Sequence, residues 1–280
     1  MKLELDSACA RFVHDGRSVG DYVLDDTYKP HFRSLLTPAG HQTVVVSPGD
    51  HRHHKGLMYA LRCKDLNFWE ETPGWQCGVQ RILSTKALPS ATGLIQDILW
   101  CGENNDLATY RETRTLQARF APAAAAFIYT WRTQRTALRD HTLIKSPWSF
   151  KHPDGRTINY HGLGIRLPWM WRFPFHQYGG VEQDGHPADP VATCGTTAPS
   201  VGFWGLIDGQ WQRSVAAVTF RQVAPQTFTW FVLKTDFAYL SLGPTNADGL
   251  SVTSGQTFDE TYAVEVADRT ATFGLPLNKS

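Results

Sequence analysis

The chain has 280 residues, of which 42% are hydrophobic and 12% aromatic, and its formal net charge is +1. This apolar content is enough for a sizeable folded core and argues against disorder. Lys and Arg are scattered along the sequence, so no basic face is available for nucleic acid, and we expect no nucleic-acid partner.

The N-terminus and the cysteines bear on the compartment. Residues 1–6 alternate polar and apolar side chains and carry acids, unlike a signal peptide. No apolar run reaches the roughly 18–20 residues that a membrane helix needs. The five cysteines are far apart and contain no CxxC pair, which favours buried thiols in a reducing compartment over disulfides or a zinc site. We therefore expect a cytoplasmic protein with no membrane partner.

Turn residues divide the first half of the chain into short alternating segments, which predicts one strand after another. Residues 11–24 indicate a hairpin through Asp15-Gly16, a strong turn dipeptide. A second pair is expected around the Pro- and Gly-containing residues 37–40. The strands predicted in this half are 2–6, 30–36, 42–46, 57–62, 79–86, 93–100, 107–120 and 127–137.

The second half continues the pattern, and little of the chain shows a helical period. Residues 107–120 place Tyr110, Glu112 and Arg114 on one face and threonines on the other, as in a wide antiparallel sheet. Residues 169–199 form a long loop rich in Pro, Gly and aromatics. The later predicted strands are 159–167, 201–207, 214–221, 227–234, 237–242 and 257–266. We predict an all-β protein, with residues 1–280 forming a single large antiparallel β-sandwich domain.

A histidine cluster is the most specific feature of the sequence. His51, His53 and His54 fall within four positions, and Glu70 follows. If the segment is extended, His51 and His53 share a face and His54 points away, bracing the loop. The pair could hold a divalent metal, with Glu70 or Glu112 as a third ligand, or act as proton donor and acceptor. The alternative is structural, because histidines in turns often satisfy backbone groups.

Other residues could complete the site. His161 precedes a glycine-rich strand that lets a ligand approach, Arg166 could hold a hydroxyl or carboxylate, and His176 could close over a ligand from the long loop. No Gly-x-Ser-x-Gly elbow, P-loop or dinucleotide fingerprint is present. The candidate catalytic residues are His51, His53, Glu70, Glu112 and His161, with His51 and His53 also as candidate metal ligands. The candidate substrate-binding residues are His54, Lys55, Trp69, Arg166, Trp169 and His176.

The chain resembles the PmoA-like family over residues 28–268. The resemblance rests on the Pro-containing run 30–40, the segment Asp50-His51-Arg52-His53-His54-Lys55-Gly56 and the pair Phe68-Trp69. Matching segments also occur at 204–209, 249–258 and 262–268. Arg52 stands where the family has Pro, and Lys55 where it has Arg, so the planar fork for binding an anion is lost.

This resemblance implies a supersandwich similar to galactose mutarotases and a role in carbohydrate catabolism. A methane oxygenase subunit, which the family name suggests, needs spanning helices that the sequence lacks. We expect a small-molecule carbohydrate as the partner, and nothing in the sequence points to an oligomeric state.

Two functions are consistent with these features. The first is an enzyme that uses the histidines and a carboxylate, with or without a divalent metal, for elimination, hydrolysis or epimerisation on a sugar or a 3-keto glycoside. The second is a non-catalytic carbohydrate-binding or accessory protein whose aromatic side chains stack on sugars. We favour the enzyme, because a binding platform needs few groups that titrate near neutral pH.

Overall fold

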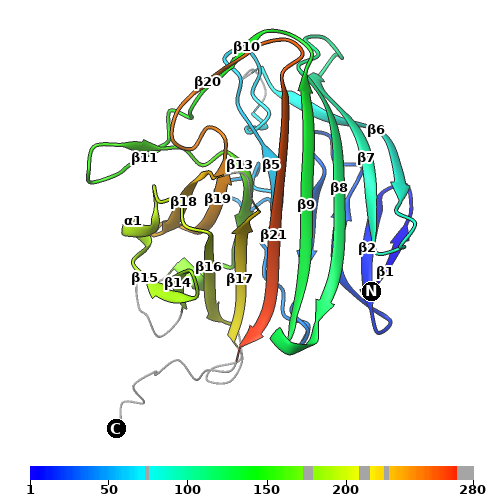
Figure 1. The fold of residues 1–280 in the computed structure, drawn as a ribbon, viewed down its shortest axis with the longest axis vertical. Coiled ribbons are helices and arrows are strands. Elements are labelled where there is room, and N and C mark those ends of the chain that lie inside the picture. The colour runs from blue at the N-terminus through cyan, green and yellow to red at the C-terminus, as the bar shows by residue number, and fades with distance from the viewer. Residues whose placement is uncertain (73–75, 173–178, 208–214, 224–226, 270–280) are drawn as a thin grey trace.

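The computed structural model describes residues 1–72, 76–172, 179–207, 215–223 and 227–269. Within these ranges the chain forms two large antiparallel sheets, of eight and nine strands, and two further two-stranded pairs (Figure 1). The predicted all-β antiparallel sandwich is therefore confirmed. None of the helices in the described ranges has the length and apolar composition needed to cross a lipid bilayer.

The eight-stranded sheet combines the N-terminal strands with three strands from the second half of the chain. Because β5 pairs with β13, the sheet brings the segment after the histidine cluster beside a strand about a hundred residues later. In spatial order its strands are β1 (Lys2–Leu5), β2 (Cys9–His14), β3 (Arg17–Val23), β4 (His31–Leu35), β5 (Leu57–Ala60), β13 (Gly162–Arg166), β19 (Ala238–Gly243) and β18 (Thr229–Lys234).

The nine-stranded sheet contains the longest strands and faces the viewer in Figure 1. In spatial order its strands are β15 (His186–Ala188), β14 (Gly179–Gln183), β16 (Ser200–Leu206), β17 (Val215–Gln222), β21 (Thr257–Arg269), β9 (Ala126–Ala137), β8 (Tyr110–Ala121), β7 (Gly93–Gly102) and β6 (Gly78–Ala87).

The remaining elements are short. The pair β11 (Phe150–Lys151) and β12 (Thr157–Ile158) forms an arm that extends away from the sheets (Figure 1). The other elements are β10 (His141–Leu143) paired with β20 (Leu250–Val252), the 3₁₀ turns η1 (Pro122–Ala124) and η2 (Trp169–Arg172), and α1 (Pro190–Thr193).

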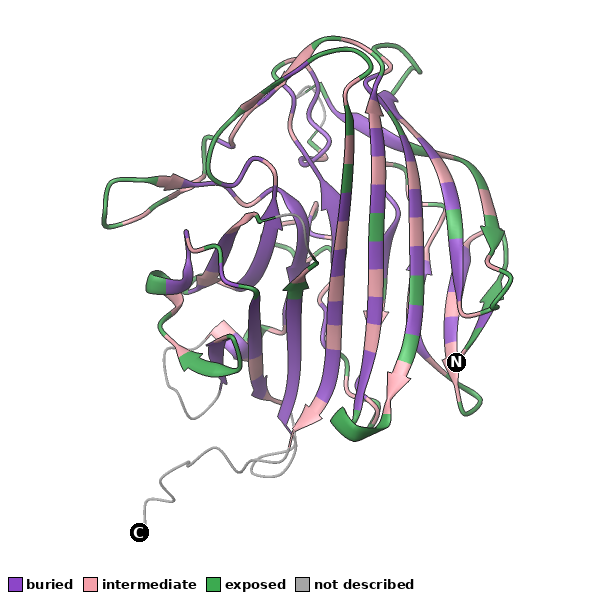
Figure 2. Cartoon of the chain, viewed as in Figure 1, coloured by how far each residue is buried: buried purple, intermediate pink, exposed green. Residues whose placement is uncertain are grey.

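Burial alternates along β8, β9 and β21, as the sequence pattern of residues 107–120 predicts (Figure 2). Tyr110, Glu112, Arg114 and Leu116 are buried on the inner face of β8, whereas the residues between them are more exposed. Successive side chains of a strand point to opposite faces, so one face of this sheet packs inward and the other meets water.

Polar groups as well as apolar packing join the two sheets. Arg114 of β8 donates to the Tyr22 hydroxyl of β3 at 2.9 Å and pairs with Glu112 at 2.8 Å, and both charged side chains are fully buried. The Tyr59 hydroxyl of β5 donates to Glu260 of β21 at 2.6 Å. Since a buried charge is costly unless paired, these contacts fix how the sheets face each other.

Two predictions at the level of elements are wrong. Residues 42–46 form isolated bridges and no strand, because Thr43 bonds Leu35 of β4 whereas Val45 bonds Arg166 of β13, so the segment follows no single neighbouring strand. The predicted loop 169–199 contains β14, β15 and α1, and β14 pairs with β16 in the nine-stranded sheet. The hairpin through Asp15-Gly16 is confirmed, with positive φ angles of 48° and 77° at these residues.

Candidate active site

The histidine cluster folds as two successive tight turns. The His51 amide donates to Pro48 O and the His54 amide donates to His51 O, both at 3.0 Å. Gly56 ends the segment at φ +71°, and a Cβ there would lie 2.2 Å from Phe32 O, so only glycine fits. The turns gather all three histidines at one place.

The predicted split between a histidine pair and an outward-pointing brace is therefore wrong. It assumed an extended segment, whereas the turns place the His51 and His53 ring centroids 5.7 Å apart. The His54 ring lies 4.7 Å from each of the other two. All three histidines line one pocket.

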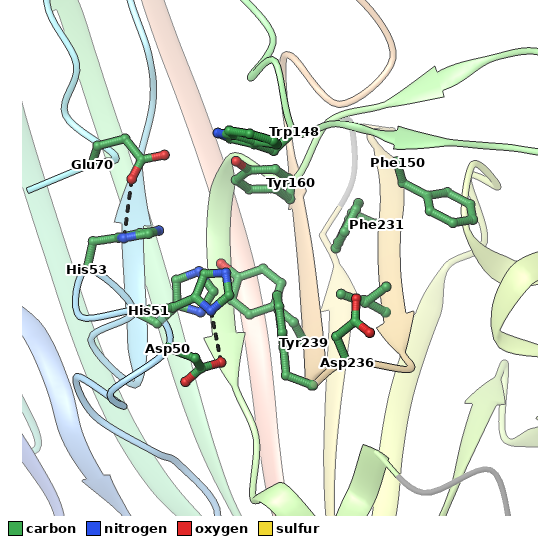
Figure 3. Close-up of a pocket in the computed structure, with 13 residues that line it drawn as sticks. Asp50, His51, His53, Glu70, Trp148, Phe150, Tyr160, Phe231, Asp236 and Tyr239 are labelled. Carbon is green, nitrogen blue, oxygen red and sulfur yellow. Dashed lines mark hydrogen bonds and ion pairs between the residues drawn. The ribbon is translucent and has the colours of Figure 1, made fainter. Parts of the chain in front are cut away.

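This pocket has a volume of about 420 Å³ and two chemically different sides (Figure 3). One side is polar and comes from the histidine turns and the segment after β5. Its residues are Asp50, His51, His53, His54 and Glu70. The other side is mainly aromatic, and its residues are Trp148, Phe150, Tyr160, Phe231, Leu233, Asp236, Phe237 and Tyr239.

His53 and Glu70 form the most buried polar pair of the pocket. The His53 Nδ1 atom lies 3.2 Å from Glu70 Oε2, and the side chains are 17% and 8% exposed. Burial, followed by the charges of Lys29 and nearby cations, lowers the pKa of His53 to about 3, and burial raises the pKa of Glu70. The distance alone would permit an ion pair, but the low pKa means that His53 is neutral near pH 7. A neutral imidazole has one ring nitrogen without a proton, and that nitrogen can accept a proton.

The Glu70 carboxylate is positioned by a turn. The Asn67 side-chain oxygen accepts hydrogen bonds from the backbone amides of Trp69 and Glu70, both at 3.0 Å. Asn67 is itself buried. An asparagine that bonds the amides two and three residues ahead fixes the direction of the chain, so Glu70 is held facing His53.

A second histidine–carboxylate pair lies beside the first. Asp50 Oδ2 is 2.9 Å from His51 Nδ1 and accepts a hydrogen bond from Arg166 Nη2 at 2.7 Å. Burial alone would raise the pKa of Asp50, but the bonds from Arg166 and His51 lower it to about 2. Asp50 therefore stays ionised and can stabilise a positive charge on His51.

Arg166 also fixes His54. Its Nη1 atom lies 3.2 Å from His54 Nδ1, and because guanidinium only donates, this nitrogen is the acceptor. Burial lowers the pKa of His54 well below its ordinary value, so the ring is neutral. The guanidinium stacks on Phe237 at 4.1 Å. Arg166 thus holds the turn from behind as a positioning residue, and it is not among the described residues that line the pocket, so its binding of a substrate hydroxyl or carboxylate stays a prediction.

Two lysines support the site from outside the pocket. Lys29 is fully buried, donates to Trp69 O at 2.7 Å and forms an ion pair with Glu71 at 2.9 Å. Lys55 pairs with Asp26 and Glu71, each at 3.1 Å. Lys55 is not among the described residues that line the pocket. Its ion pairs therefore stabilise the site from outside and do not place it to bind a substrate there.

Trp69 and His161 lie behind the histidines. Both are fully buried, their ring centroids are 5.1 Å apart, and the Trp69 ring packs 6.2 Å from that of His53. Burial and the charge of Arg62 lower the pKa of His161 to about 3. Neither ring is part of the described pocket lining, so both support the pocket wall without reaching a ligand.

The structure places Glu112 and Trp169 away from the pocket. Glu112 is buried between the sheets, where it accepts from Arg114, from Trp100 Nε1 and from the Thr133 hydroxyl, both of the latter at 2.7 Å. These bonds outweigh burial and lower its pKa. Trp169 is half exposed and stacks with Arg172 at 3.8 Å. His176 lies outside the described residues.

The aromatic side of the pocket was missed by the sequence analysis. It comes from the segment leading into the arm and from the β18–β19 hairpin, which lie about a hundred residues or more from the histidines. The only sequence signal was the general excess of aromatic residues.

A metal site is not assembled in the described part of the chain. No group of three or more His, Cys, Asp or Glu side chains there is arranged to hold an ion. His51 and His53 offer two imidazoles, and metal binding by this pair stays a prediction.

A family model matches residues 9–273, which is nearly the whole chain, and its description is "Family of unknown function (DUF6807)". The chain belongs to the DUF6807 family. The resemblance to the PmoA-like family is therefore wrong, because the family model that matches is a different one. No curated protein matches this DUF6807 member.

Solved structures similar to this DUF6807 chain include three α-galactosidases. The GH36 enzyme AgaB from Geobacillus stearothermophilus has a TM-score of 0.45 and 10% identity, over 96% of this chain and 41% of that chain. AgaA from the same organism has 0.44 and 9%, over 96% and 40%. The enzyme from Lactobacillus brevis has 0.43 and 9%, over 96% and 39%. This chain thus spans about two fifths of their length.

Proposed function

We propose that the protein is an enzyme that acts on a carbohydrate by acid–base catalysis, with His53 as the base and His51 as the acid. The observation that carries this proposal is the pairing of His53 with Glu70 in the pocket, where His53 Nδ1 lies 3.2 Å from Glu70 Oε2. It places a neutral imidazole beside a carboxylate in the pocket, and the neutral ring is the form of histidine that can take up a proton.

The pocket lining supports a sugar as the ligand. Flat aromatic side chains can cover the C–H faces of a pyranose ring, and Tyr160 and Phe237 lie next to the polar side. Carboxylate and imidazole groups accept or donate hydrogen bonds to hydroxyls. A site with a few convergent polar groups among aromatic side chains is typical of a small-molecule pocket.

The proposed chemistry begins with removal of a proton next to a carbonyl. In a 3-keto glycoside the ketone acidifies the C2 proton, which His53 Nε2 takes. The electron pair left on C2 forms the C1=C2 double bond while the C1–O bond breaks. The departing oxygen receives a proton from His51, whose positive charge Asp50 stabilises. The products are an unsaturated keto sugar and the free alcohol.

Glu70 and Asp50 have the same role in this scheme, which is to orient an imidazole. Asp50 is hydrogen-bonded to His51 Nδ1, and Glu70 lies 3.2 Å from His53 Nδ1, so neither carboxylate occupies an Nε2 atom. The same pair would serve epimerisation, with the proton returned to the opposite face, or hydrolysis, with His53 activating a water. A carbohydrate-binding protein without catalysis is the alternative that the experiment must separate.

The test is incubation of the protein with a panel of glycosides and their 3-keto forms, with and without a chelator, followed by product analysis. We expect turnover of at least one substrate, with a loss of about 100-fold or more in kcat for His53→Asn, since general base catalysis contributes roughly that much. Unchanged turnover in both His51→Asn and His53→Asn would reject the assigned roles. Binding without product over long incubation would favour the non-catalytic protein, and loss of turnover with chelator would favour a metal site.

A further inference from the structure

We propose that the substrate is a sugar carrying a planar apolar substituent, such as the aryl group of an aryl glycoside. The subsite for this substituent consists of Trp148, Phe150 and Phe231. This inference rests on the proposed function, because it assigns the substrate class of the same pocket.

The two sides of the pocket require a ligand with two chemically different parts. In Figure 3, Glu70, His53 and Asp50 lie on one side of the pocket, and Phe150 and Phe231 on the other. Most groups that can bond sugar hydroxyls lie on the first side, whereas the second offers Asp236 and the tyrosine hydroxyls among a larger number of apolar rings. An apolar group gains most on the second, because it removes apolar surface of both ligand and protein from water.

Trp148 is the strongest evidence for an apolar group. Its side chain is 71% exposed, whereas five other tryptophans are less than 2% exposed. An exposed indole at a pocket mouth forgoes the large stabilisation that burial of an aromatic ring provides. Trp148 does not stand alone, because Phe150 and Phe231 line the same pocket, and grouped apolar side chains of this kind mark a binding surface.

The turn that carries Trp148 is fixed by buried polar contacts. Asn159, which is fully buried, accepts from the Ser146 amide at 3.1 Å, and the Ser146 hydroxyl accepts from the Trp148 amide at 3.2 Å. Lys145 donates to Thr157 O across the arm at 2.9 Å. The backbone at Trp148 is therefore held in place before a ligand arrives, which reduces the entropy lost on binding.

Phe231, on the same side of the pocket as Trp148, is equally well supported. The Phe231 ring lies 5.5 Å from the ring of Tyr160 and 6.1 Å from that of Tyr239. Phe231 is 4% exposed, so its position is set by the core. A planar group bound against Trp148 and Phe231 would contact both rings, and the sugar would then lie towards the polar side with His51 and His53.

The experiment is calorimetric titration of the protein with matched methyl and 4-nitrophenyl glycosides of several common sugars. We expect the 4-nitrophenyl member of at least one pair to bind about tenfold tighter, a difference of about 1.4 kcal/mol. Trp148→Ala should reduce this ratio to below about threefold without changing the affinity for the methyl glycoside. Trp148→Phe keeps an aromatic ring, so it should retain most of the preference for the 4-nitrophenyl glycoside.

Two controls make the result decisive. Leu83→Ala removes another exposed apolar side chain, on β6, and should change neither affinity. Thermal unfolding of each variant checks folding, and Trp148 variants should melt as the wild type does because the side chain is exposed. Equal binding of both glycosides, a ratio unaffected by Trp148→Ala, or no binding of any pair would overturn the inference.

Binding and turnover measured together distinguish a failure of the aromatic subsite from a failure of the proposed enzyme. Preferential binding of aryl glycosides without turnover of any keto or unmodified form would reject the enzyme and keep the subsite. Turnover with no preference for the aryl member would reject the subsite and keep the enzyme.

Discussion

The replacement of His53 by Asn tests whether the imidazole is neutral in the folded protein. In the unfolded chain a histidine binds a proton below its ordinary pKa of 6.5, whereas burial holds the pKa of His53 at about 3. The unfolded state therefore binds more protons between these values, so stability falls as the pH drops through this window. From about pH 7.5 to about pH 5, this difference costs the wild type about 2 kcal/mol. Above about pH 7.5, His53 is neutral in both the folded and the unfolded chain, so it makes no pH-dependent contribution to stability.

His53→Asn removes the pH-dependent contribution of the imidazole to the free energy of unfolding and leaves a polar side chain beside Glu70. The free energy of unfolding, measured by urea denaturation across this pH range, should therefore fall about 2 kcal/mol less in the variant than in the wild type. His186→Asn is the control, since His186 is exposed on β15 and does not line the pocket. Parallel curves for wild type and His53→Asn would mean that folding leaves the pKa of His53 unchanged, and a wild type that gains stability relative to the variant as the pH falls would mean that His53 is protonated and ion-paired with Glu70. The reasoning that makes it the base would then fail.

Four further outcomes are expected. Lys29→Met should lower the free energy of unfolding by about 3 kcal/mol in urea, because it removes a buried partner of Glu71, and an unchanged midpoint would contradict this. Asp50→Asn should reduce kcat about 100-fold, because His51 loses its ionised partner; an effect on KM alone would argue against that role. Glu112→Gln should destabilise the fold by about 3 kcal/mol but leave kcat within about twofold, since the carboxylate lies away from the pocket. Sugar phosphates should inhibit at least about tenfold more weakly than the neutral sugars, because three carboxylate residues and no Lys or Arg are among the described lining residues.

Local sequence patterns predicted much of the sheet structure. Alternation along residues 107–120 correctly separates the buried face with Glu112 from the solvated one, because side chains of a strand alternate. The strand β14 was missed since it begins with Gly179 and Gly180, which have no side chain to show alternation. Its pairing with β16 is a long-range contact, and no local pattern reports it.

In the candidate site, too, residues close in sequence were predicted and residues from distant segments were not. His51, His53 and Glu70 were found because they are close in sequence, and the structure brings them together at one pocket. The direction of His54 was predicted wrongly, since it depends on two turns ending at Gly56. Trp148 carries no local sign of its role, because its place at the pocket follows from where the β11–β12 arm leaves the sheets.

The two sides of the pocket have separate origins in the chain. The histidine turns depend on Gly56, Asn67 and Arg166, so few substitutions there would preserve the geometry. Trp148, by contrast, lies in an exposed turn whose hydrogen bonds are local to the base of the arm. The sequence of the arm can therefore change, and with it the ligand that the pocket prefers, while the histidine turns keep their geometry. Family members should differ most in the arm and least in the turns.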